Sequence, residues 1–438
     1  MRSRSTCMTV RHVAGSGDHG VVVLDDDPTG VQTLAGVRVL LRWDADHVRR
    51  ALAGRRSVHL ITNVRALPAE AAHEVTAQAA RTALAGVPDA LVVLRGDSTL
   101  RGHVREEVLA LAEAVTPGRL PPLLLVPALP SAGRVTIGGV HMLEREGRRI
   151  PLHQTEYASD GVFSYKDARV LVWAEERTAG LLRARDGREL HLDELRSGGP
   201  ALVAAALRQL EQAGRPAALV PDVGDASDLE LVARGYEQAL EDGVTALVRC
   251  APAFAGALSG ATAEGFAPAP RAVRALLVCG SWLSTATAQL HALVDAYPGS
   301  IVEVDVEALA SPDPEPEIER AAATASTLLR AGPLAVLTTP RRRPAGTETF
   351  AAGARISAGL ARAAGNVSPR PSCVVVKGGI TSCVTLRDGF GAREADVLGP
   401  LLPGVSHWRT GELDYVVVPG NVGDERLLAD VVERVLGG

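Results

Sequence analysis

The sequence predicts a two-domain α/β protein in which mostly parallel sheets are covered by helices, and three observations predict it. Short apolar runs rich in valine and leucine alternate with alanine-rich segments of helical period, such as residues 68–86. The 438 residues exceed the roughly 100 to 200 residues typical of one domain. A stretch rich in glycine, alanine and proline, residues 256–272, has no clear period and is typical of a linker.

The first predicted domain contains apolar runs typical of strands that are buried on both faces of a sheet. They are residues 21–24, 58–62, 90–95, 122–128 and 217–221. Between about residues 130 and 195 glycine and charge become more frequent, and the runs at 148–152, 168–176 and 188–192 predict an antiparallel insertion. Because ligands of parallel sheets bind beyond the carboxyl ends of strands, we expect the functional groups in the loops that follow the strands.

Beyond the linker the alternation of strands and helices resumes with further apolar runs. They are residues 275–281, 300–306, 333–339, 372–377 and 414–419. A second α/β unit therefore closes the chain. The expected parts are a flexible N-terminal tail (1–20), a first domain (21–255), the linker (256–272) and a second domain (273–438).

Composition argues against several classes of protein. The chain is 46% hydrophobic with a formal net charge of −5, and no block of like charges marks nucleic acid or an anionic membrane as a partner. Its five cysteines are scattered without a CxxC pair, which argues against a disulfide framework or structural zinc site and favours a reducing cytoplasm. No apolar run reaches membrane-spanning length, and the opening residues lack the apolar segment of a signal peptide.

Three consecutive aspartates, 25–27, follow the first strand and precede Pro28, Thr29 and Gly30. Carboxylates on adjacent residues repel one another, so this sequence favours a place where water or a cation is close. A solvated turn explains the same residues. Because side chains alternate along an extended chain, we expect residues 25 and 27 to point to one side and residue 26 to the other.

A second polar segment, RGDSTLRG at residues 95–102, also follows a strand. Asp97, Ser98 and Thr99 are residues that could cap the helix that follows, with Arg101 as a surface charge. Paired with the aspartate turn at the edge of one sheet, however, they would form a pocket for a small hydroxylated carboxylate. In such a pocket arginine binds the carboxylate and aspartate accepts hydrogen bonds from hydroxyls.

The second domain offers glycine turns after three of its strands. In residues 374–382 a buried strand runs into Gly378 and Gly379, a geometry in which bare backbone amides hold phosphates. The spacing of a P-loop is absent, so a tight structural turn is the alternative. Similar turns lie in residues 279–284 and 416–425, and three turns that converge at one sheet edge would suit a nucleotide.

Taken together, the motifs DDxTG, DSTLRG, PSAGRVTIGGVH (130–141), GGITS and GNVGDE resemble the four-carbon acid sugar kinase family, in order and spacing, from about residue 20 to 435. The resemblance implies a sugar-acid-binding first domain, an ATP-binding second domain and phosphoryl transfer in the interdomain cleft. It implies ATP and Mg²⁺ as cofactors and a substrate such as threonate, erythronate or 3-oxo-tetronate. A homo-oligomer is compatible with it.

The sequence and the resemblance together give candidate site residues. The candidate catalytic carboxylates are Asp27, Asp26 and Asp97. The candidate substrate-binding residues are Thr29, Gly30, Arg65, Ser98, Arg101, Gly102 and Arg134. The candidate nucleotide-binding residues are Ser281, Lys377, Gly378, Gly379, Ile380, Thr381 and Gly420.

Phosphoryl transfer needs a carboxylate that orients the attacking hydroxyl and Mg²⁺ that bridges the phosphates. We expect Asp27 or Asp26 to hold and deprotonate the hydroxyl, with Asp97 as a competing base, while ATP itself carries most of the metal. Arg101 and Arg134 would bind the substrate carboxylate. Lys377 would reach a phosphate, although its place directly after an apolar strand equally permits a structural role.

The chain departs from the commoner family pattern at Pro28, Arg95 and Ile380, which leaves the identity of the acid open. Two other functions fit parts of the sequence. A non-catalytic sensor of sugar acids would keep both binding sites without turnover. An NAD-dependent dehydrogenase would use similar glycine turns, but no GxGxxG motif follows the first strand.

Overall fold

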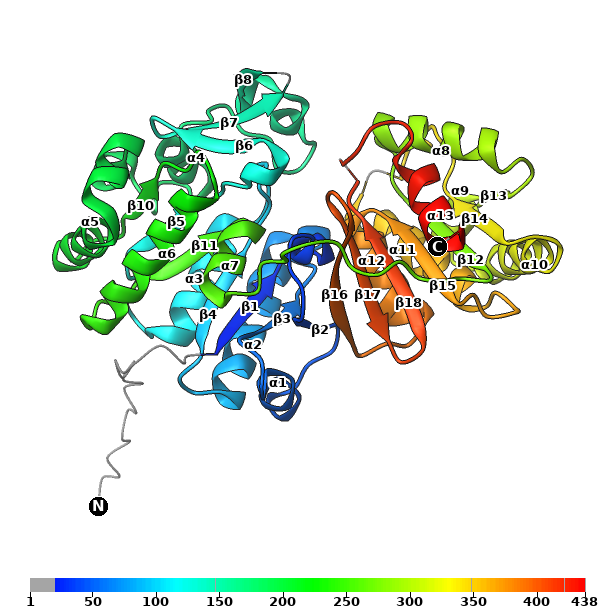
Figure 1. Cartoon of the computed structure of the whole chain (residues 1–438), viewed down its shortest axis with the longest axis horizontal. Helices are drawn as coiled ribbons and strands as arrows, with labels where there is room; N and C mark the ends of the chain where they lie inside the picture. The colour runs from blue at the N-terminus through cyan, green and yellow to red at the C-terminus, as the bar shows by residue number, and fades with distance from the viewer. Residues whose placement is uncertain (1–19, 146, 348, 421, 438) are drawn as a thin grey trace. The chain divides into compact units, whose positions relative to one another are not determined.

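The computed structural model describes residues 20–145, 147–347, 349–420 and 422–437 and divides the chain into two compact units (Figure 1). Of the predicted N-terminal tail, residues 1–19 lie outside the described residues. Unit 1 is built from residues 20–22, 44–50 and 73–258, and unit 2 from residues 23–43, 51–72 and 259–437. Two early segments thus pack with the C-terminal half of the chain.

Unit 1 contains a parallel sheet in which every pair of neighbouring strands runs in the same direction. Its strand order is β4 (Leu91–Arg95), β11 (Leu247–Cys250), β5 (Leu123–Val126), β10 (Ala218–Pro221) and β9 (Arg188–Leu190). Strands β4, β5 and β10 confirm three predicted runs. Strand β11 was not predicted, because its short apolar run is interrupted by Arg249, whose buried guanidinium pairs with Glu107 at 3.0 Å.

The helices that lie wholly or mainly in unit 1 follow the strands along the chain. They are α2 (Ala69–Gly86), α3 (Val104–Val115), α4 (Val170–Arg177), α5 (Leu192–Gln212), α6 (Ala226–Glu241) and α7 (Pro252–Ser259), with α1 (Ala45–Leu52) spanning the border between the units. Helices α5 and α6 lie side by side (Figure 1). The core of the sheet is apolar, since strands β5 and β10 are buried throughout.

The predicted antiparallel insertion is confirmed in part. Strands β6 (Arg134–Ile137), β7 (Val140–Arg145) and β8 (Arg148–Pro151) form a separate antiparallel sheet. The prediction was wrong for residues 168–176, which form helix α4: their buried residues follow helical spacing and pack one face inward. It was also wrong for residues 188–192, because β9 pairs in parallel with β10.

Unit 2 contains a longer, mixed sheet. Its strand order is β13 (Ile301–Glu303), β14 (Leu334–Thr338), β12 (Ala275–Cys279), β15 (Cys373–Lys377), β18 (Leu413–Val418), β17 (Val405–Thr410), β16 (Glu394–Leu402), β2 (Arg38–Leu40) and β3 (Ser57–Ile61). The segment from β13 to β18 is parallel, as predicted. The antiparallel strands β16 and β17 were not predicted. Strand β1 (Val21–Asp25) begins in unit 1 and ends in unit 2.

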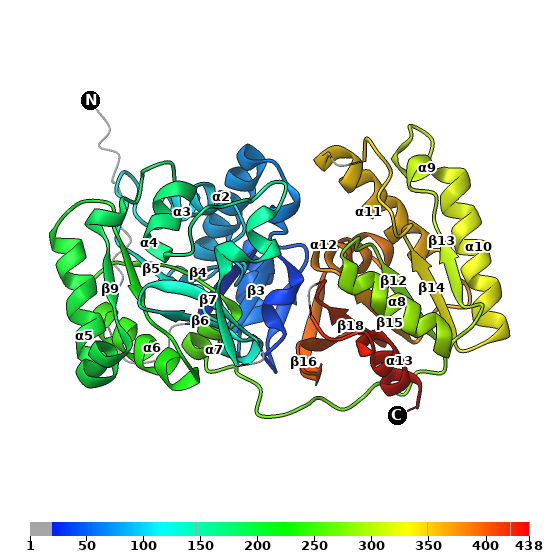
Figure 2. The same cartoon turned by 90° about the horizontal axis from the view of Figure 1, so that it is seen from above.

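Helices pack on both faces of the parallel part of this sheet (Figure 2). One face holds α9 (Val306–Ala310), α10 (Glu315–Ala331), α11 (Phe350–Gly365) and α12 (Gly379–Val384), and the other holds α8 (Ser284–Ala296) and α13 (Leu427–Gly437). The chain therefore leaves β12 over one face and leaves its neighbours β14 and β15 over the other. Such a switch point is where open α/β sheets bind ligands, beyond the carboxyl ends of the strands.

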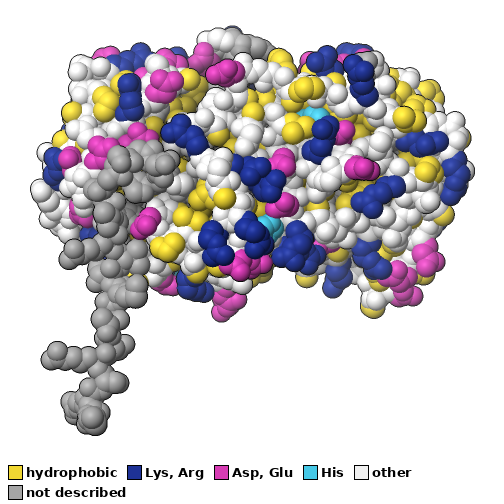
Figure 3. Space-filling model, turned by 60° about the horizontal axis from the view of Figure 1, so that its bottom comes forward, with side chains coloured by type: hydrophobic (Ala, Val, Ile, Leu, Met, Phe, Trp, Pro, Cys, Tyr) yellow, Lys and Arg dark blue, Asp and Glu magenta, His cyan; other side chains and the backbone are white. Residues whose placement is uncertain are grey.

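Surface charge agrees with the composition. On the face shown in Figure 3, basic and acidic side chains are intermingled over the molecule, and no large area of a single sign stands out. Among the described residues, no helix has both the length and the apolar character needed to cross a membrane.

Candidate functional site

The aspartate turn at the end of β1 is a buried, capped turn of unit 2. Asp27 is the N-cap of a short 3₁₀ turn, η1 (Pro28–Val31), and its carboxylate accepts hydrogen bonds from the Thr29 amide at 2.7 Å and from the Thr29 hydroxyl. Pro28 suits the first position of such a turn because its fixed φ fits and its missing N–H needs no partner. The side chains of Asp25 and Asp26 are fully buried, so the solvated-turn alternative is wrong.

The three aspartates have different partners. Asp25 lies 3.1 Å from Nδ1 of the buried His59, and its carboxylate packs so tightly on Gly30 that a Cβ there would overlap it. Asp26 and Asp27 both contact Arg65, whose Nε lies 2.9 Å from Asp26. The expectation that Asp25 and Asp27 would share one side is therefore wrong, because β1 ends at Asp25 and the alternation ends with it.

The predicted glycine turns of unit 2 converge at the carboxyl ends of the neighbouring strands β12, β15 and β18. A Cβ on Gly280 would lie 2.5 Å from the Thr381 hydroxyl, and one on Gly420 would lie 3.7 Å from the Ser281 hydroxyl. Gly378 has a φ of 108°, a conformation that glycine adopts without strain, and its amide bonds the Val418 carbonyl at 2.8 Å. Backbone groups of three turns are therefore close together.

Lys377 ends β15 fully buried and points its ammonium at backbone rather than at solvent. Its Nζ donates to the carbonyls of Pro419 at 2.8 Å and Val422 at 3.3 Å. Burial lowers the pKa of Lys377 to about 8. These bonds hold the loop that contains Gly420 at the end of β15. The geometry of Lys377 therefore favours a positioning role over direct contact with a phosphate.

The aspartate turn and the central glycine turn meet, although they are far apart in the sequence. A Cβ on Gly379 would lie 2.7 Å from Oδ2 of Asp27, so only glycine leaves room for this carboxylate. Ile380, next in the chain, is exposed, while Thr381 is buried. A hydroxyl bound to Asp27 and a phosphate held by the backbone at Gly379 would therefore be neighbours.

Unit 1 carries the second predicted polar loop, RGDSTLRG. The Asp97 carboxylate accepts hydrogen bonds from Arg101 Nε at 2.7 Å and from the Thr99 hydroxyl. The helix-cap alternative is wrong, because α3 begins only at Val104 and its N-cap is His103. Burial alone would lower the pKa of Arg101, but the charges and hydrogen bonds of Asp97 and Asp160 raise it above the ordinary value.

The backbone of this loop is held by three buried side chains that the sequence reasoning missed. The carbonyls of residues 98, 99 and 100 accept hydrogen bonds from His141 Nε2 at 2.9 Å, the Tyr165 hydroxyl at 3.1 Å and Trp173 Nε1 at 3.1 Å. Burial lowers the pKa of His141 to about 4, so its ring is neutral at pH 7. Leu100 has a φ of 65°, which a non-glycine residue adopts rarely. The loop is thus fixed by packing from outside.

Arg134, at the start of β6, is a buried cation of a different kind. Its residue is 5% exposed, and its Cζ lies 5.8 Å from the centre of the Tyr157 ring, as does Cζ of Arg101. Among the described residues, the Arg134 guanidinium has no carboxylate partner and its Nε makes no hydrogen bond. An unpaired buried charge is costly, so this arrangement indicates an anionic ligand.

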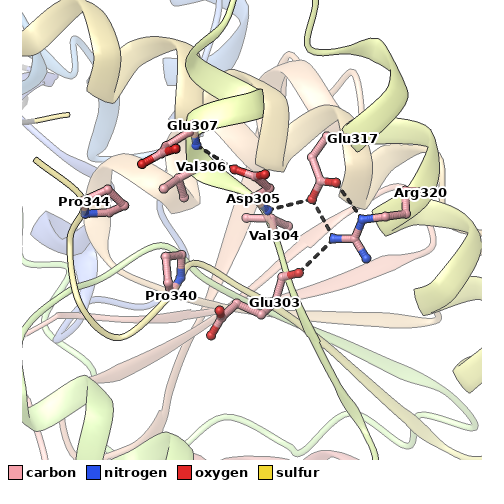
Figure 4. Close-up of a pocket in the computed structure, with 9 residues that line it drawn as sticks. All are labelled: Glu303, Val304, Asp305, Val306, Glu307, Glu317, Arg320, Pro340 and Pro344. Atoms are coloured by element: carbon pink, nitrogen blue, oxygen red, sulfur yellow. Dashed lines mark hydrogen bonds and ion pairs between the residues drawn. The ribbon is translucent and has the colours of Figure 1, made fainter. Parts of the chain in front are cut away.

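A further hollow of unit 2 lies at the ends of β13 and β14 (Figure 4). Its polar lining residues are mainly acidic: Glu303, Asp305, Glu307 and Glu317, with Arg320. Glu317 accepts a hydrogen bond from the Asp305 amide and pairs with Arg320, so part of this charge is already used within the fold. The remaining carboxylates would repel a phosphate. This hollow is therefore a poorer candidate for a phosphate site than the glycine turns.

Comparison with known families identifies the class of the protein. Residues 21–258 match the family described as "sugar-binding N-terminal domain", and residues 276–428 match the family described as "nucleotide-binding C-terminal domain". The chain therefore belongs to the four-carbon acid sugar kinase family, as its motifs predicted.

Two curated relatives carry more particular names. The chain is 31% identical over 261 residues to D-erythronate kinase of Heliobacterium modesticaldum, a match that covers 58% of this chain and 54% of that protein. It is 27% identical over 330 residues to D-threonate kinase of Salmonella typhimurium, covering 74% of this chain and 72% of the relative. The chain thus spans about half the length of the first relative.

Solved structures confirm the two-part α/β fold. Haemophilus influenzae protein HI1011 covers 95% of this chain and all (100%) of its own, with 17% identity and a TM-score of 0.62. A Salmonella typhimurium LT2 protein, provisionally described as a tRNA synthase, covers 95% of this chain and 99% of its own, with 20% identity and a TM-score of 0.69. At these identities the likeness concerns the fold alone.

Proposed function

We propose that this protein is an ATP-dependent kinase that phosphorylates a hydroxyl of a sugar acid of about four carbons, such as erythronate, threonate or 3-oxo-tetronate. Family membership and the names of the two curated relatives support the class of reaction. The observation that carries the proposal is the contact of the Asp27 carboxylate with Gly379, which joins a candidate base to a candidate phosphate site.

The sugar acid binds at the polar loop of unit 1. Its carboxylate pairs with Arg134, a buried cation of unit 1 that lacks a carboxylate partner among the described residues. Ser98 supplies a hydroxyl from the same loop, and Asp97, which accepts the Thr99 hydroxyl, also accepts hydrogen bonds from substrate hydroxyls. Gly102, with a φ of 125°, lets the loop turn away toward α3.

The nucleotide binds at the carboxyl ends of β12, β15 and β18. Ser281, Gly378 to Thr381 and Gly420 offer backbone amides and hydroxyls to its phosphates. The switch in helix direction at β12 supports this location, while the acidic hollow of Figure 4 does not suit phosphate. Lys377 positions the Gly420 loop through its hydrogen bond to the Pro419 carbonyl.

Mg²⁺ fits this site as a partner of the nucleotide. The described residues contain no group of three histidine, cysteine or acidic side chains that would hold a metal by themselves. Asp27, whose carboxylate packs against Gly379, and the adjacent Asp26 are oxygen donors of the kind Mg²⁺ prefers. Bound there with the phosphates, the ion would offset the repulsion between these carboxylates and the triphosphate.

The chemistry assigned to the chain is positioning and proton transfer. Asp27 orients the substrate hydroxyl and takes its proton as the oxygen forms a bond to the γ-phosphorus, while the bond from that phosphorus to the leaving ADP oxygen breaks. Arg65 holds Asp26 and Asp27 in place from the other side. The transfer requires the bound acid and the bound nucleotide to be brought together.

A screen of substrates tests the proposal. ADP release is measured with ATP, Mg²⁺ and a panel of three- to six-carbon aldonic and keto acids, alongside calorimetric binding of each ligand. Turnover confined to acids near four carbons is expected. Binding of acid and ATP without turnover would favour the sensor alternative, and a rise in melting temperature with NAD but not ATP would favour a dehydrogenase.

A cytoplasmic location belongs to the same proposal. No disulfide joins the four cysteines that the structure describes, Cys250, Cys279, Cys373 and Cys383, and all four are buried. Free thiols are typical of proteins in a reducing compartment.

A further inference from the structure

The segment that joins β8 to α4 places two residues, Tyr157 and Asp160, beside arginines of the candidate sugar-acid site in unit 1. No sequence motif predicted either residue. The segment contains the short turns η4 (Leu152–Gln154) and η5 (Glu156–Ser159). From it, Tyr157 places its ring 5.8 Å from the guanidinium carbons of both Arg101 and Arg134, and Asp160 lies 3.4 Å from Arg101 Nη1. The two arginines thus share one aromatic neighbour and differ in their acidic neighbours.

Asp160 is held in a fixed orientation by its own chain. One carboxylate oxygen, Oδ1, accepts hydrogen bonds from the amides of Val162 and Phe163 at 2.9 Å each, which directs Oδ2 toward Arg101. Arg101 therefore stands between two carboxylates, Asp97 and Asp160. A cation with two carboxylate partners has little attraction left for a third, whereas Arg134 has no carboxylate partner among the described residues.

Tyr157 has the properties of a wall of the binding site. Its residue is half-buried, and its hydroxyl makes no hydrogen bond to any described residue. A ring at this distance from a guanidinium attracts the cation through its π face. A carboxylate bound to Arg134 would therefore have the Tyr157 ring as a close neighbour, with a free hydroxyl at its edge.

We propose that Tyr157 determines which sugar acids the site accepts, and that Asp160 is a positioning residue that reserves Arg134 for the single carboxylate of the substrate. The inference rests on the proposed function and deepens it. Tyr157 limits the space beside the carboxylate and favours short acids. Asp160 saturates Arg101, so that a second carboxylate of an acid finds Arg101 already paired with two carboxylates.

Variants at Tyr157 test the size limit. Tyr157→Ala is expected to raise the KM of the preferred four-carbon acid about 10-fold with kcat changed less than 3-fold, and to raise kcat/KM for six-carbon acids relative to four-carbon acids. Tyr157→Phe, which keeps the ring, should retain the preference for short acids. The control Tyr297→Ala, at the end of α8 in unit 2, should change neither. An unchanged ratio between acids in Tyr157→Ala would overturn the inference.

The Asp160→Asn variant tests the reservation of Arg134. Its amide oxygen can still accept the two backbone hydrogen bonds, while Arg101 loses one of its two negative partners. Calorimetry without nucleotide should then show that a four-carbon dicarboxylic hydroxy acid gains about 10-fold in affinity relative to the matching monocarboxylic acid. Loss of affinity for both acids in equal proportion would contradict the assignment, and a variant that merely misfolds cannot produce a gain.

These measurements separate the inference from the proposed function. Acid binding by calorimetry in the wild-type and Tyr157→Ala proteins reports on the site whether or not phosphate is transferred. If no acid is turned over but the variant shifts the binding preference toward longer acids, the proposed function fails and the inference stands. If turnover occurs and the preference is unchanged, the proposed function stands and the inference fails.

Discussion

The aspartate turn of unit 2 and the polar loop of unit 1 are built from the same short pattern. In each an aspartate accepts a hydrogen bond from the hydroxyl of a threonine two residues later, Asp27 from Thr29 and Asp97 from Thr99. Each aspartate also contacts an arginine. What differs is the surroundings: Asp27 faces a glycine turn and the neighbouring Asp26, while the Asp97 loop lies in the same unit as an unpaired buried cation.

This difference in surroundings explains why we propose different roles for the aspartate turn and the polar loop. Beside Asp27, a second carboxylate and the backbone amides of the glycine turn would suit a proton acceptor that works next to a bound phosphate. In unit 1 the charge of Asp97 is offset by Arg101, and Arg134 leaves a positive charge without a partner, which suits an anion. The role of each aspartate therefore depends on the charges that other elements of the fold place beside it.

The largest expected effect tests the role of Asp27. Asp27→Asn keeps the side chain's size and its cap on Thr29 but removes the charge and basicity, so kcat should fall about 10²- to 10⁴-fold. The melting temperature should change little. The surface variant Asp46→Asn serves as the control. If Asp27→Asn and Asp26→Asn both keep wild-type turnover, the base must be sought at Asp97.

A contrast between two buried arginines of unit 1 sharpens the comparison. Arg134→Met should raise the KM for the sugar acid about 100-fold without lowering the melting temperature of the free protein, because the wild-type charge has no carboxylate partner there. Arg249→Met should destabilise the fold by about 3 to 5 kcal/mol, because it removes a guanidinium that pairs with the buried Glu107 at 3.0 Å. Equal losses of stability in both variants would contradict the assignment of Arg134 as the anion receptor.

The pH dependence of stability should reveal the role of His141, which supports the polar loop of unit 1. Folding lowers the pKa of His141 from an ordinary value of 6.5 to about 4, so the unfolded chain binds a proton in this range that the folded chain does not. The free energy of unfolding should therefore be unaffected by His141 above about pH 7.5 and fall by about 2 kcal/mol from there to pH 5. Urea unfolding at several pH values measures it, and His141→Gln should reduce the slope.

The smallest expected effect concerns the contact between the two turns of unit 2. Gly379→Ala places a Cβ 2.7 Å from the Asp27 carboxylate, so the turn must shift and ATP affinity should fall about 10-fold while sugar-acid binding stays the same. Gly353→Ala, in α11 with open space around it, is the matched control. Calorimetry with each ligand separately distinguishes the two outcomes. Unchanged nucleotide affinity would move the ATP site elsewhere.

The sequence by itself determined the fold class, most of the parallel strands and the turns at strand ends that carry the candidate site residues. Continuous apolar runs identify buried parallel strands because both faces of such strands lie against helices, and the polar and glycine-rich turns follow from the chemistry of strand ends. The same local rules failed where a tertiary partner decides: Arg249 breaks the run of β11 but is neutralised by Glu107, and residues 168–176 pack as a helix.

Only the tertiary structure decided which of these residues meet. Segments distant along the chain meet in four places. Asp27 contacts Gly379, Asp26 and Asp27 share Arg65, Lys377 is buried against two carbonyls, and Tyr157 lies beside two arginines. No local pattern encodes such a contact, because periodicity and turn chemistry act over a few residues. The physical reason is that burial and charge depend on every element packed around a side chain, and these neighbours exist only once the chain has folded.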